Sequence, residues 1–167
     1  ISVNGNAAVL VPEEMIRLGE TINAPLEVNL FHRTQVRVNK IIRYLRSLGA
    51  KNMRTKSDAL IPGIEHERAK VDSQGIFSAD VVLVPLEDGD RCKALVDMGK
   101  KVIAIDLNPL SRTAQTADVT IVDNVVRAIP NMIRFAEELK GSNKDDLRTL
   151  IDGFDNKENL AEAIDII

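Results

Sequence analysis

The sequence predicts an α/β fold with a Rossmann-like, three-layer architecture and a doubly wound, mostly parallel sheet. Short apolar runs, of which residues 81–84 are the clearest, alternate with amphipathic stretches, as in successive βαβ units. Aromatic residues make up only 3% of the chain, so the core must be built from Ile, Val, Leu and Ala, which suit buried parallel strands. The 167 residues, 44% of them hydrophobic, suffice for one domain with a sizeable core.

The individual elements follow from hydrophobic spacing and from the signals at their ends. We expect strands at residues 1–3, 26–30, 80–85, 102–106 and 119–122, and helices at about residues 12–23, 35–48, 90–98 and 124–140. Thr34 is placed to cap the second helix, and Gly49 to end it. Residues 51–78 are less regular, with a short strand near Met53 and a loop through Pro62 and Gly63.

Charge divides the chain near residue 140. Residues 141–167 hold seven Asp and Glu against three Lys and Arg, a net charge of −4, whereas residues 1–140 carry +1. We therefore expect a Rossmann-like nucleotide- and substrate-binding domain over residues 1–140 and an acidic C-terminal helical tail over residues 141–167. The sequence starts without Met inside an apparent strand, which suggests that a segment precedes it.

Composition excludes several classes of function. A nearly neutral body with few aromatic residues is not typical of nucleic-acid-binding proteins. Cys92, the single cysteine, allows neither a disulfide framework nor a cysteine-based zinc site, and it favours the reducing cytoplasm. The sequence has no apolar run of membrane-spanning length, no signal peptide, no GxGxxG fingerprint and no P-loop. With His32 and His66 as the only histidines, a His-rich metal site is excluded as well.

Ligands of open α/β sheets bind beyond the carboxyl ends of the strands, so the residues that follow each strand are the candidates. After the strand at 102–106, Asp106 and Asn108 are placed to bind ribose hydroxyls. Arg112 and Thr113 are placed to bind phosphate oxygens. The alternative is a strand-ending Asp that caps a turn beside an exposed Arg.

Other strand ends also have a chemical and a structural interpretation. Asn124 and Arg33 lie at the starts of predicted helices, where each would bind an anion. Alternatively, Asn124 only caps its helix, and Arg33 is a solvated loop residue. Residues 87–90 contain three carboxylates, which would hold a metal such as Mg²⁺ or an ammonium group. Alternatively, these residues form a glycine turn in which Asp90 caps the next helix.

Residues 65–71 are the densest group of charged side chains. If the run is helical, His66 and Lys70 share one face. A lysine and Arg68 beside a carboxylate would there bind an anionic substrate and stabilise charge at a reacting phosphate. The alternative is a surface helix with local ion pairs, which is what such charge runs usually form.

Six segments, read in order, together resemble one family. They are Val3–Asn6, Asn29–Thr34, His66–Val71, Ser78–Arg91, Ile105–Ala114 and Arg127–Met132. The set is similar to archaeal 4-phosphopantoate–β-alanine ligase, also called phosphopantothenate synthetase, and the acidic tail matches less well. The resemblance implies a Rossmann-like homodimer that acts in coenzyme A biosynthesis. It implies that 4-phosphopantoate is joined to β-alanine through an acyl-adenylate, with ATP split to AMP and pyrophosphate.

The resemblance also implies which residues contact ATP. They are Asp106, Leu107, Asn108, Arg112, Thr113, Asn124 and Val125. Members of the family have a helical segment before the first strand, whose arginines help to hold ATP, and this sequence lacks it. We therefore expect ATP binding and catalysis by this chain alone to be incomplete.

Further residues are expected to serve the other reactants. The candidate catalytic residues are Arg68, Lys70, His66 and Glu67, and the candidate substrate-binding residues are Asn4, Asn6, Arg33 and Asp88. Among them, His66 or Glu67 would take a proton from the amine of β-alanine. Two anionic reactants favour Mg²⁺ together with ATP, while the ligands of any metal stay unknown.

A non-catalytic regulatory module is the rival hypothesis. Gly99–Asp106 and Ala117–Val119 also resemble sugar-phosphate isomerase and other binding domains of doubly wound folds. Such a module would bind a nucleotide or a sugar phosphate, and it would not need the charged cluster at His66–Lys70. Likeness of fold alone does not separate the two hypotheses.

Overall fold

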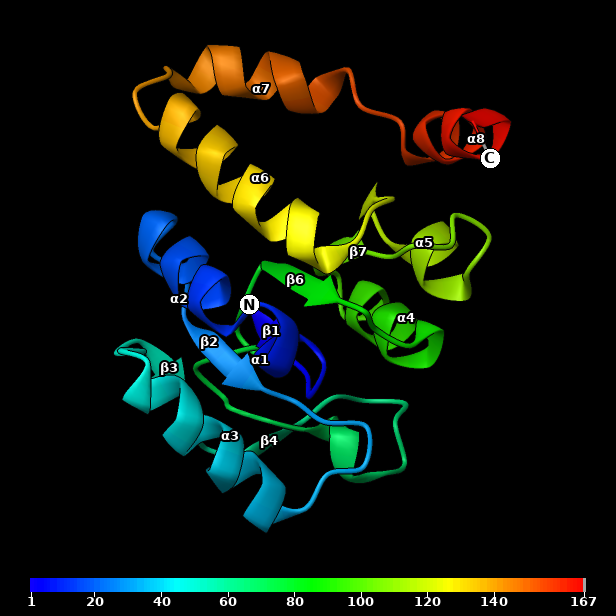
Figure 1. The fold of residues 1–167 in the computed structure, drawn as a ribbon. Helices are drawn as coiled ribbons and strands as arrows, with labels where there is room; N and C mark the ends of the chain where they lie inside the picture. The colour runs from blue at the N-terminus through cyan, green and yellow to red at the C-terminus, as the bar shows by residue number, and fades with distance from the viewer. Residues whose placement is uncertain (167) are drawn as a thin grey trace.

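Strands and helices alternate along residues 1–166, the part of the chain that the computed structural model describes (Figure 1). The parallel strands are β1 (Ser2–Val3), β2 (Leu26–Val28), β3 (Met53–Arg54), β6 (Val81–Pro85), β7 (Lys101–Ile105) and β8 (Val119–Ile121). The helices are α1 (Ala7–Leu10), α2 (Pro12–Thr21), α3 (Gln35–Ser47), α4 (Gly89–Asp97), α5 (Arg112–Thr116), α6 (Val125–Leu139), α7 (Lys144–Asp152) and α8 (Asn156–Ile166). Each predicted strand and helix is present, with shifted ends. The sequence did not predict α1 or α5, because four or five residues are too few to show a helical period.

The six parallel strands form two three-stranded sheets that lie edge to edge. β1, β2 and β3 form the first sheet, and β6, β7 and β8 form the second. β1 lies beside β6, so the order across the molecule is β3-β2-β1-β6-β7-β8. This arrangement confirms the predicted Rossmann-like fold. It also places the reversal of strand order between β1 and β6, where such folds bind ligands.

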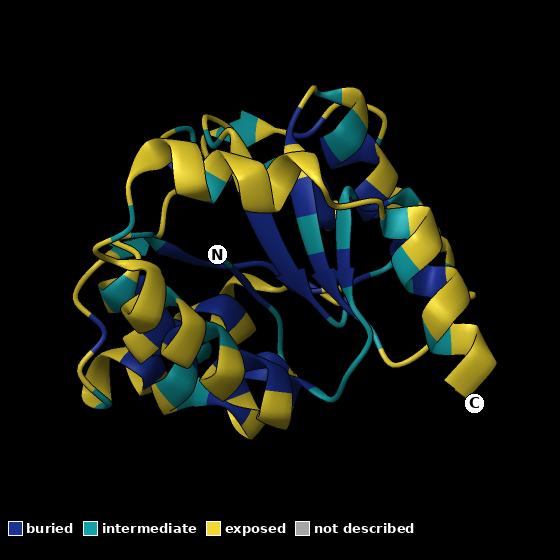
Figure 2. Cartoon of the chain, turned by 90° about the horizontal axis from the view of Figure 1, so that it is seen from above, coloured by how far each residue is buried: buried dark blue, intermediate teal, exposed yellow. Residues whose placement is uncertain are grey.

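Each face of the sheet has its own hydrophobic core, because side chains alternate along the strands. In β6, Val82 and Val84 belong to one core and Leu83 to the other. Helices α1, α2, α3 and α6 cover the core that contains Leu83, whereas α4 and the chain between β3 and β6 cover the opposite one. Figure 2 shows the buried strands between helices whose outer surfaces are exposed, which is the predicted three-layer arrangement.

The ends of α3 follow the signals in the sequence. Thr34 caps the helix, since its hydroxyl oxygen accepts the N–H of Arg37 at 3.2 Å. Gly49 follows the helix with φ of +103°, a backbone conformation that side chains with a Cβ rarely adopt. The predicted cap and the predicted stop are therefore both confirmed.

Residues 65–71 do not form the helix that would have placed His66 and the lysine of this run on one face. A single 3-10 turn, η1 (Glu67–Ala69), leads directly into β5 (Lys70–Val71). β5 pairs antiparallel with β4 (Ala59–Leu60). Helical spacing therefore does not apply to this run.

A buried carboxylate fastens the end of this hairpin to the sheet. Glu27 on β2 accepts hydrogen bonds from the main-chain N–H groups of Asp72 and Ile76 at 2.9 and 2.7 Å. Burial raises the pKa of Glu27, and these hydrogen bonds act against the rise. The contact fixes the segment that carries η1 relative to the parallel strands.

Helix α8 is tied to the exposed edge of the sheet. The side-chain oxygen of Asn156 accepts the N–H of Thr120 on β8 at 2.8 Å, and Asn159 donates to the carbonyl oxygen of Thr120 at 2.9 Å. The helix thus satisfies polar groups that an edge strand would otherwise leave unpaired. Across residues 1–166, no helix has the length and apolar character needed to cross a membrane.

Candidate functional site

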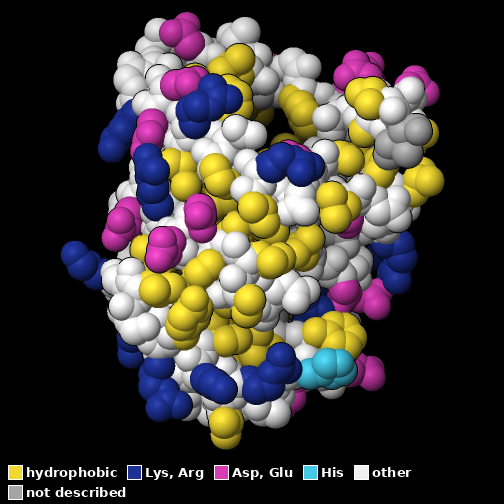
Figure 3. Space-filling model, viewed as in Figure 1, with side chains coloured by type: hydrophobic (Ala, Val, Ile, Leu, Met, Phe, Trp, Pro, Cys, Tyr) yellow, Lys and Arg dark blue, Asp and Glu magenta, His cyan; other side chains and the backbone are white. Residues whose placement is uncertain are grey.

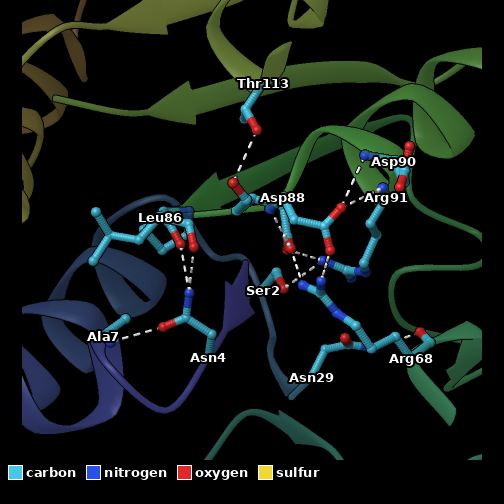
Figure 4. Close-up of polar contacts among 12 residues, drawn as sticks. Ser2, Asn4, Ala7, Asn29, Arg68, Leu86, Asp88, Asp90, Arg91 and Thr113 are labelled. Carbon is cyan, nitrogen blue, oxygen red and sulfur yellow. Dashed lines mark hydrogen bonds and ion pairs between the residues drawn. The ribbon is translucent and has the colours of Figure 1, made fainter. Parts of the chain in front are cut away.

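Asn4 joins the two strand ends at the reversal point (Figure 4). Its Nδ2 donates to the carbonyl oxygens of Pro85 and Leu86 at 2.8 and 2.9 Å, and its Oδ1 accepts the N–H of Ala7 at 2.9 Å. One side chain therefore connects the end of β1, the start of α1 and the end of β6. These bonds fix the relative position of two strands that lie in separate sheets.

A cavity of about 260 Å³ opens beside Asn4, and we refer to it as the crevice. It is lined by Asn4, Gly5, Asn6, Leu30, Phe31, His32, Arg37, Arg68, Leu86, Glu87 and Asp88. Apart from Arg68, which lies in η1, these residues follow three strands that are far apart in the sequence, β1, β2 and β6. The crevice lies where doubly wound folds bind ligands, and its mixture of amides, arginines and carboxylates suits a small polar molecule. Of the predicted substrate-binding residues, Asn4, Asn6 and Asp88 lie here.

Arg68 is a buried cation of the crevice, with 3% of its side chain exposed. Its guanidinium donates to the carboxylates of Glu87 and Asp88 and lies 5.1 Å from the centroid of the Phe31 ring. Burial lowers the pKa of Arg68, and the charge of Glu87 acts against this shift. The two carboxylates and the ring hold the guanidinium in one orientation at the crevice.

Glu87 is the buried carboxylate between two arginines. Its side chain is 1% exposed, as is that of Arg91, and it accepts hydrogen bonds from both Arg68 and Arg91. It also accepts the N–H of Asp88 at 2.9 Å, while Arg91 donates to the hydroxyl of Ser2 at 3.2 Å. Removing one partner from a buried ion cluster costs about 3–5 kcal/mol, because a charge is left uncompensated.

The loop between β7 and α5 is held by its own side chains. Asp106 accepts the N–H of Asn108 at 2.9 Å and a hydrogen bond from the hydroxyl of Ser111. Ser111 in turn caps α5 by accepting the N–H of Ala114 at 3.0 Å. The turn-capping alternative is therefore present. It does not compete with ligand binding, because a carboxylate has further lone pairs and Asn108 is exposed.

Arg112 and Thr113 connect this loop to the crevice. Thr113 is buried, and its hydroxyl donates to the carbonyl oxygen of Glu87 at 2.8 Å (Figure 4). Arg112 is exposed and pairs with Asp90 at 2.6 Å. A Cβ on Gly89 would lie 2.5 Å from the Cβ of Arg112, so only glycine allows α4 and α5 to begin this close together. The loop and the crevice are thus direct neighbours.

The remaining predicted ATP contacts lie at the start of α6 and in the same loop. The side chain of Asn124 caps α6 by accepting the N–H of Val126 at 3.0 Å. Val125 is 1% exposed and packs in the core, so only its main chain is available to a ligand. Leu107 is 57% exposed and offers an apolar surface beside the loop.

Three predicted catalytic residues lie outside the crevice lining. Lys70 and Glu67 form an exposed ion pair at 2.8 Å, as the surface interpretation of residues 65–71 proposed. His66 caps η1 and lines a separate hollow of about 320 Å³ beside α4. Only Arg68 turns from this run into the crevice.

The arginine that lines the crevice from α3 is Arg37, whereas Arg33 lies outside it. Arg33 is buried and donates to the hydroxyl of Ser57 at 2.5 Å and to the carbonyl oxygen of Val28 at 3.4 Å. Arg37 lies in the first turn of α3 and donates to the carbonyl oxygen of His32. The solvated-loop interpretation of Arg33 is therefore wrong, because the side chain is buried.

Sequence reasoning also missed Glu87 and Arg91 as a unit, and Arg37. A partial signal for the first pair existed, since an acid and a base four residues apart often pair, although Glu87 itself lies before the start of α4. For Arg37 the signal was its position three residues after the cap Thr34, at the positive end of a helix. The spacing does not reveal that Glu87 and Arg91 are buried, because their burial depends on contacts between β1 and α4.

The carboxylates at residues 87–90 are already occupied. Glu87 and Asp88 bind arginines, and Asp90 pairs with Arg112. Asp88 also caps α4 by accepting the N–H of Asp90 at 2.8 Å, so Asp90 is not the helix cap that the sequence suggested. Among residues 1–166, no three His, Cys, Asp or Glu side chains gather as a metal site. These residues do not fit a protein-bound Mg²⁺.

A parallel sheet that reverses its strand order at a polar crevice defines a Rossmann-like α/β protein with a small-molecule site. A family model described as phosphopantothenate/pantothenate synthetase matches residues 1–167. The chain belongs to this family, which confirms the resemblance seen in its ordered segments.

Individual relatives agree with the family model. The 4-phosphopantoate–beta-alanine ligase of Methanosarcina mazei is 54% identical over 164 residues, which cover 98% of this chain and 65% of the relative. Proteins of the same name from Thermococcus kodakarensis and Thermococcus onnurineus are each 52% identical over 166 residues, with 98% of this chain and 64% of the relative covered. The chain therefore spans just under two thirds of the length of these curated relatives.

Proposed function

We propose that the protein is an ATP-dependent ligase of coenzyme A biosynthesis. It joins 4-phosphopantoate to β-alanine and forms 4′-phosphopantothenate, AMP and pyrophosphate. The observation that carries the proposal is the contact between the crevice and the loop 106–113 at Gly89 and Arg112. A carboxylate bound in the crevice and a nucleotide bound at the loop would meet there. The names of the relatives support the choice of substrates. We further propose a cytoplasmic homodimer that acts on small molecules.

In this proposal, ATP binds along the loop after β7. Asp106 and Asn108 accept and donate hydrogen bonds at the ribose, and the exposed Leu107 supplies apolar contact. Arg112 leaves Asp90 and binds phosphate oxygens, because a guanidinium forms stronger hydrogen bonds with a polyanion than with one exposed carboxylate. Further contacts come from Thr113, Asn124 and Val125. Mg²⁺ is expected to accompany the phosphates of ATP rather than to bind protein carboxylates.

The crevice holds 4-phosphopantoate. Arg68 and Arg37 neutralise its charges, and Asn4 and Asn6 bind its polar groups, while Asp88 faces the ammonium group of β-alanine. A carboxylate oxygen of 4-phosphopantoate attacks the α-phosphorus of ATP, and pyrophosphate leaves. The ammonium group of β-alanine first loses a proton, its amine nitrogen then attacks the acyl carbon, AMP leaves, and the nitrogen loses a second proton. The protein contributes alignment and charge neutralisation. Roles for His66, Glu67, Lys70 and Arg33 stay predictions.

The test is to incubate the full chain with ATP, 4-phosphopantoate and β-alanine and to quantify every product. Since catalysis by this chain alone is expected to be incomplete, the proposal predicts slow turnover in which 4′-phosphopantothenate, AMP and pyrophosphate form in equal amounts. ADP and phosphate in place of AMP would contradict the adenylate route. Thermal stabilisation by sugar phosphates but not by ATP, with no ligation, would support the rival binding module instead.

A further inference from the structure

We propose that Glu87 is a positioning residue, which acts by holding the guanidinium of Arg68 in the orientation that meets the anionic substrate. The inference rests on the proposed function, since that function places 4-phosphopantoate in the crevice. Figure 4 shows the arrangement around Arg68, Arg91 and Asp88. With 1% of its side chain exposed, Glu87 reaches the substrate through Arg68 rather than directly.

The backbone of Leu86 turns Glu87 into the protein. If the extended conformation of β6 continued, Leu86 would face the same core as Val84, and Glu87 would face the other. Instead, Leu86 adopts φ of +51° and packs on the opposite core. Its N–H donates to the carbonyl oxygen of Ile105 at 3.0 Å, and its carbonyl oxygen accepts from Asn4. Such backbone strain persists where the surroundings enforce it, often at functional sites.

Glu87 is the one buried anion that the two arginines share. Its Oε1 accepts from Arg68 and its Oε2 from Arg91. Without this carboxylate, two buried guanidinium groups would face each other, with only the partly exposed Asp88 to offset them. Arg91 has no other carboxylate partner within residues 1–166. Loss of Glu87 would therefore displace Arg68 from the crevice.

The atoms around the cluster offer little alternative bonding. Nε of Arg68, Nε and Nη2 of Arg91, and Oδ1 of Asn29 are buried without a hydrogen-bond partner in the described chain. Released from Glu87, Arg68 would keep only Asp88 as a carboxylate partner, and Arg91 would keep only the hydroxyl of Ser2. The dependence of both buried arginines on Glu87 distinguishes this residue from an acid in an exposed ion pair.

The first test is a double-mutant cycle on the full chain, with Glu87→Gln and Arg68→Gln measured singly and together. For Glu87→Gln we expect kcat/KM for 4-phosphopantoate to fall about 100-fold, because a small displacement of a substrate-binding group has an effect of that order. The KM for ATP should change less than about twofold. In the Arg68→Gln background, Glu87→Gln should lower kcat/KM for 4-phosphopantoate by less than a further factor of about three. If the two substitutions lower kcat/KM independently, so that their effects multiply in the double variant, the proposal is overturned.

Two further variants separate positioning from loss of stability. Ile133→Ala in α6 removes buried apolar contacts on the opposite face and lowers Tm, but it should leave both KM values unchanged. If Glu87→Gln does not fold, the Glu87→Gln/Arg91→Gln variant keeps the buried charge balanced and replaces it in the cycle. An equal loss of kcat/KM in Ile133→Ala and in the Glu87 variant would count against positioning.

An NMR measurement tests the positioning of Arg68 without relying on catalytic activity. In the unmodified full chain, the Nε–H of Arg68 should exchange slowly with solvent, and Glu87→Gln should make this exchange at least about tenfold faster. If the unmodified chain makes no 4′-phosphopantothenate but this change occurs, the proposed function fails and the positioning stands. An unchanged Arg68 signal would overturn the positioning itself.

Discussion

Arg112 and Asp90 form an exposed ion pair at the junction of the crevice and the loop, with 70% and 74% of their side chains exposed. Exposed pairs contribute about 0–1 kcal/mol, so bound phosphate would displace Asp90 easily. Arg112→Ala should raise the KM for ATP about tenfold, because it removes a charge-assisted hydrogen bond worth about 1.5–3 kcal/mol. Asp90→Asn should lower that KM up to about fivefold.

Steady-state kinetics with varied ATP measure both effects. Lys93→Ala is the matched control, since Lys93 pairs with Asp97 on the same helix, away from the loop. It should leave the KM for ATP unchanged. Equal ATP kinetics in Arg112→Ala and the unmodified protein would remove Arg112 from the ATP site.

Asp118 makes the stability of the protein depend on acid pH. Burial alone would raise the pKa of Asp118, but hydrogen bonds from Lys101 Nζ and the N–H of Val102, at 2.7 and 2.9 Å, outweigh it and lower the pKa below its usual 3.8. The ionised carboxylate therefore stabilises the folded state above about pH 3.8, and this contribution is lost as the pH falls through the lowered pKa.

The corresponding experiment compares Tm of the unmodified protein and of Asp118→Asn at several pH values. The unmodified protein should be the more stable of the two at pH 7, and the difference should shrink below pH 4. A difference in Tm that is constant from pH 7 to pH 3 would contradict this assignment.

Single residues differ in how far the sequence reveals their roles. Asp106 and Asn124 were identified as candidates because Asp106 ends a predicted strand and Asn124 lies between a predicted strand and a helix, which are local signals. The sequence placed Glu87 among three candidate carboxylates but did not predict its pairing with arginines, because its burial depends on Ser2 and Arg91, which are 89 residues apart. No local pattern encodes a contact of that separation.

Among the elements, α3 and its flanking segments stand out by charge. Residues 28–57 contain eight Lys and Arg and no Asp or Glu. Among the described residues, none of the eight forms an ion pair with a carboxylate, whereas many cations elsewhere do. Lys and Arg side chains gather over α3 at the lower edge of Figure 3, and Arg37 continues this basic surface into the crevice. We expect the surface to attract anionic substrates.

Reversing two of these charges tests the attraction. Lys40→Glu with Arg43→Glu, both on the exposed side of α3, should lower kcat/KM for 4-phosphopantoate several-fold at low salt. The difference should vanish at about 0.5 M salt, where charges are screened over a few ångströms. Lys144→Glu with Arg148→Glu in α7 is the control and should have no effect. A loss that is independent of salt would contradict steering.

Secondary-structure elements were predicted correctly where hydrophobic spacing determines them. The prediction failed where a tertiary contact determines the conformation of the chain. The strands and α3 follow their apolar periodicity. Residues 65–71 would satisfy a helical pattern, but Nδ2 of Asn29 donates to the carbonyl oxygens of Arg68 and Lys70 at 3.1 and 3.3 Å, beside the β4–β5 hairpin. This contact holds the chain extended after η1, and the sequence of the run does not encode it.

For the whole molecule, the sequence predicts the fold class but not the strand order. Alternating strands and helices imply a parallel sheet, yet several orders satisfy that pattern. The observed order depends on β1 lying beside β6, where Asn4 binds carbonyl groups more than 80 residues away. That contact creates the crevice and brings it beside the loop 106–113, so the site follows from the strand order.

The central claim is that a carboxylate in the crevice attacks a nucleotide at this loop. The most direct test uses the full chain with ATP, β-alanine and 4-phosphopantoate labelled with ¹⁸O in both carboxylate oxygens, followed by mass spectrometry of the nucleotide product. The acyl-adenylate route transfers one labelled oxygen to AMP, because the attacking oxygen stays on the α-phosphorus when the amine displaces AMP. Unlabelled AMP, or label in inorganic phosphate with ADP as the nucleotide, would contradict the claim.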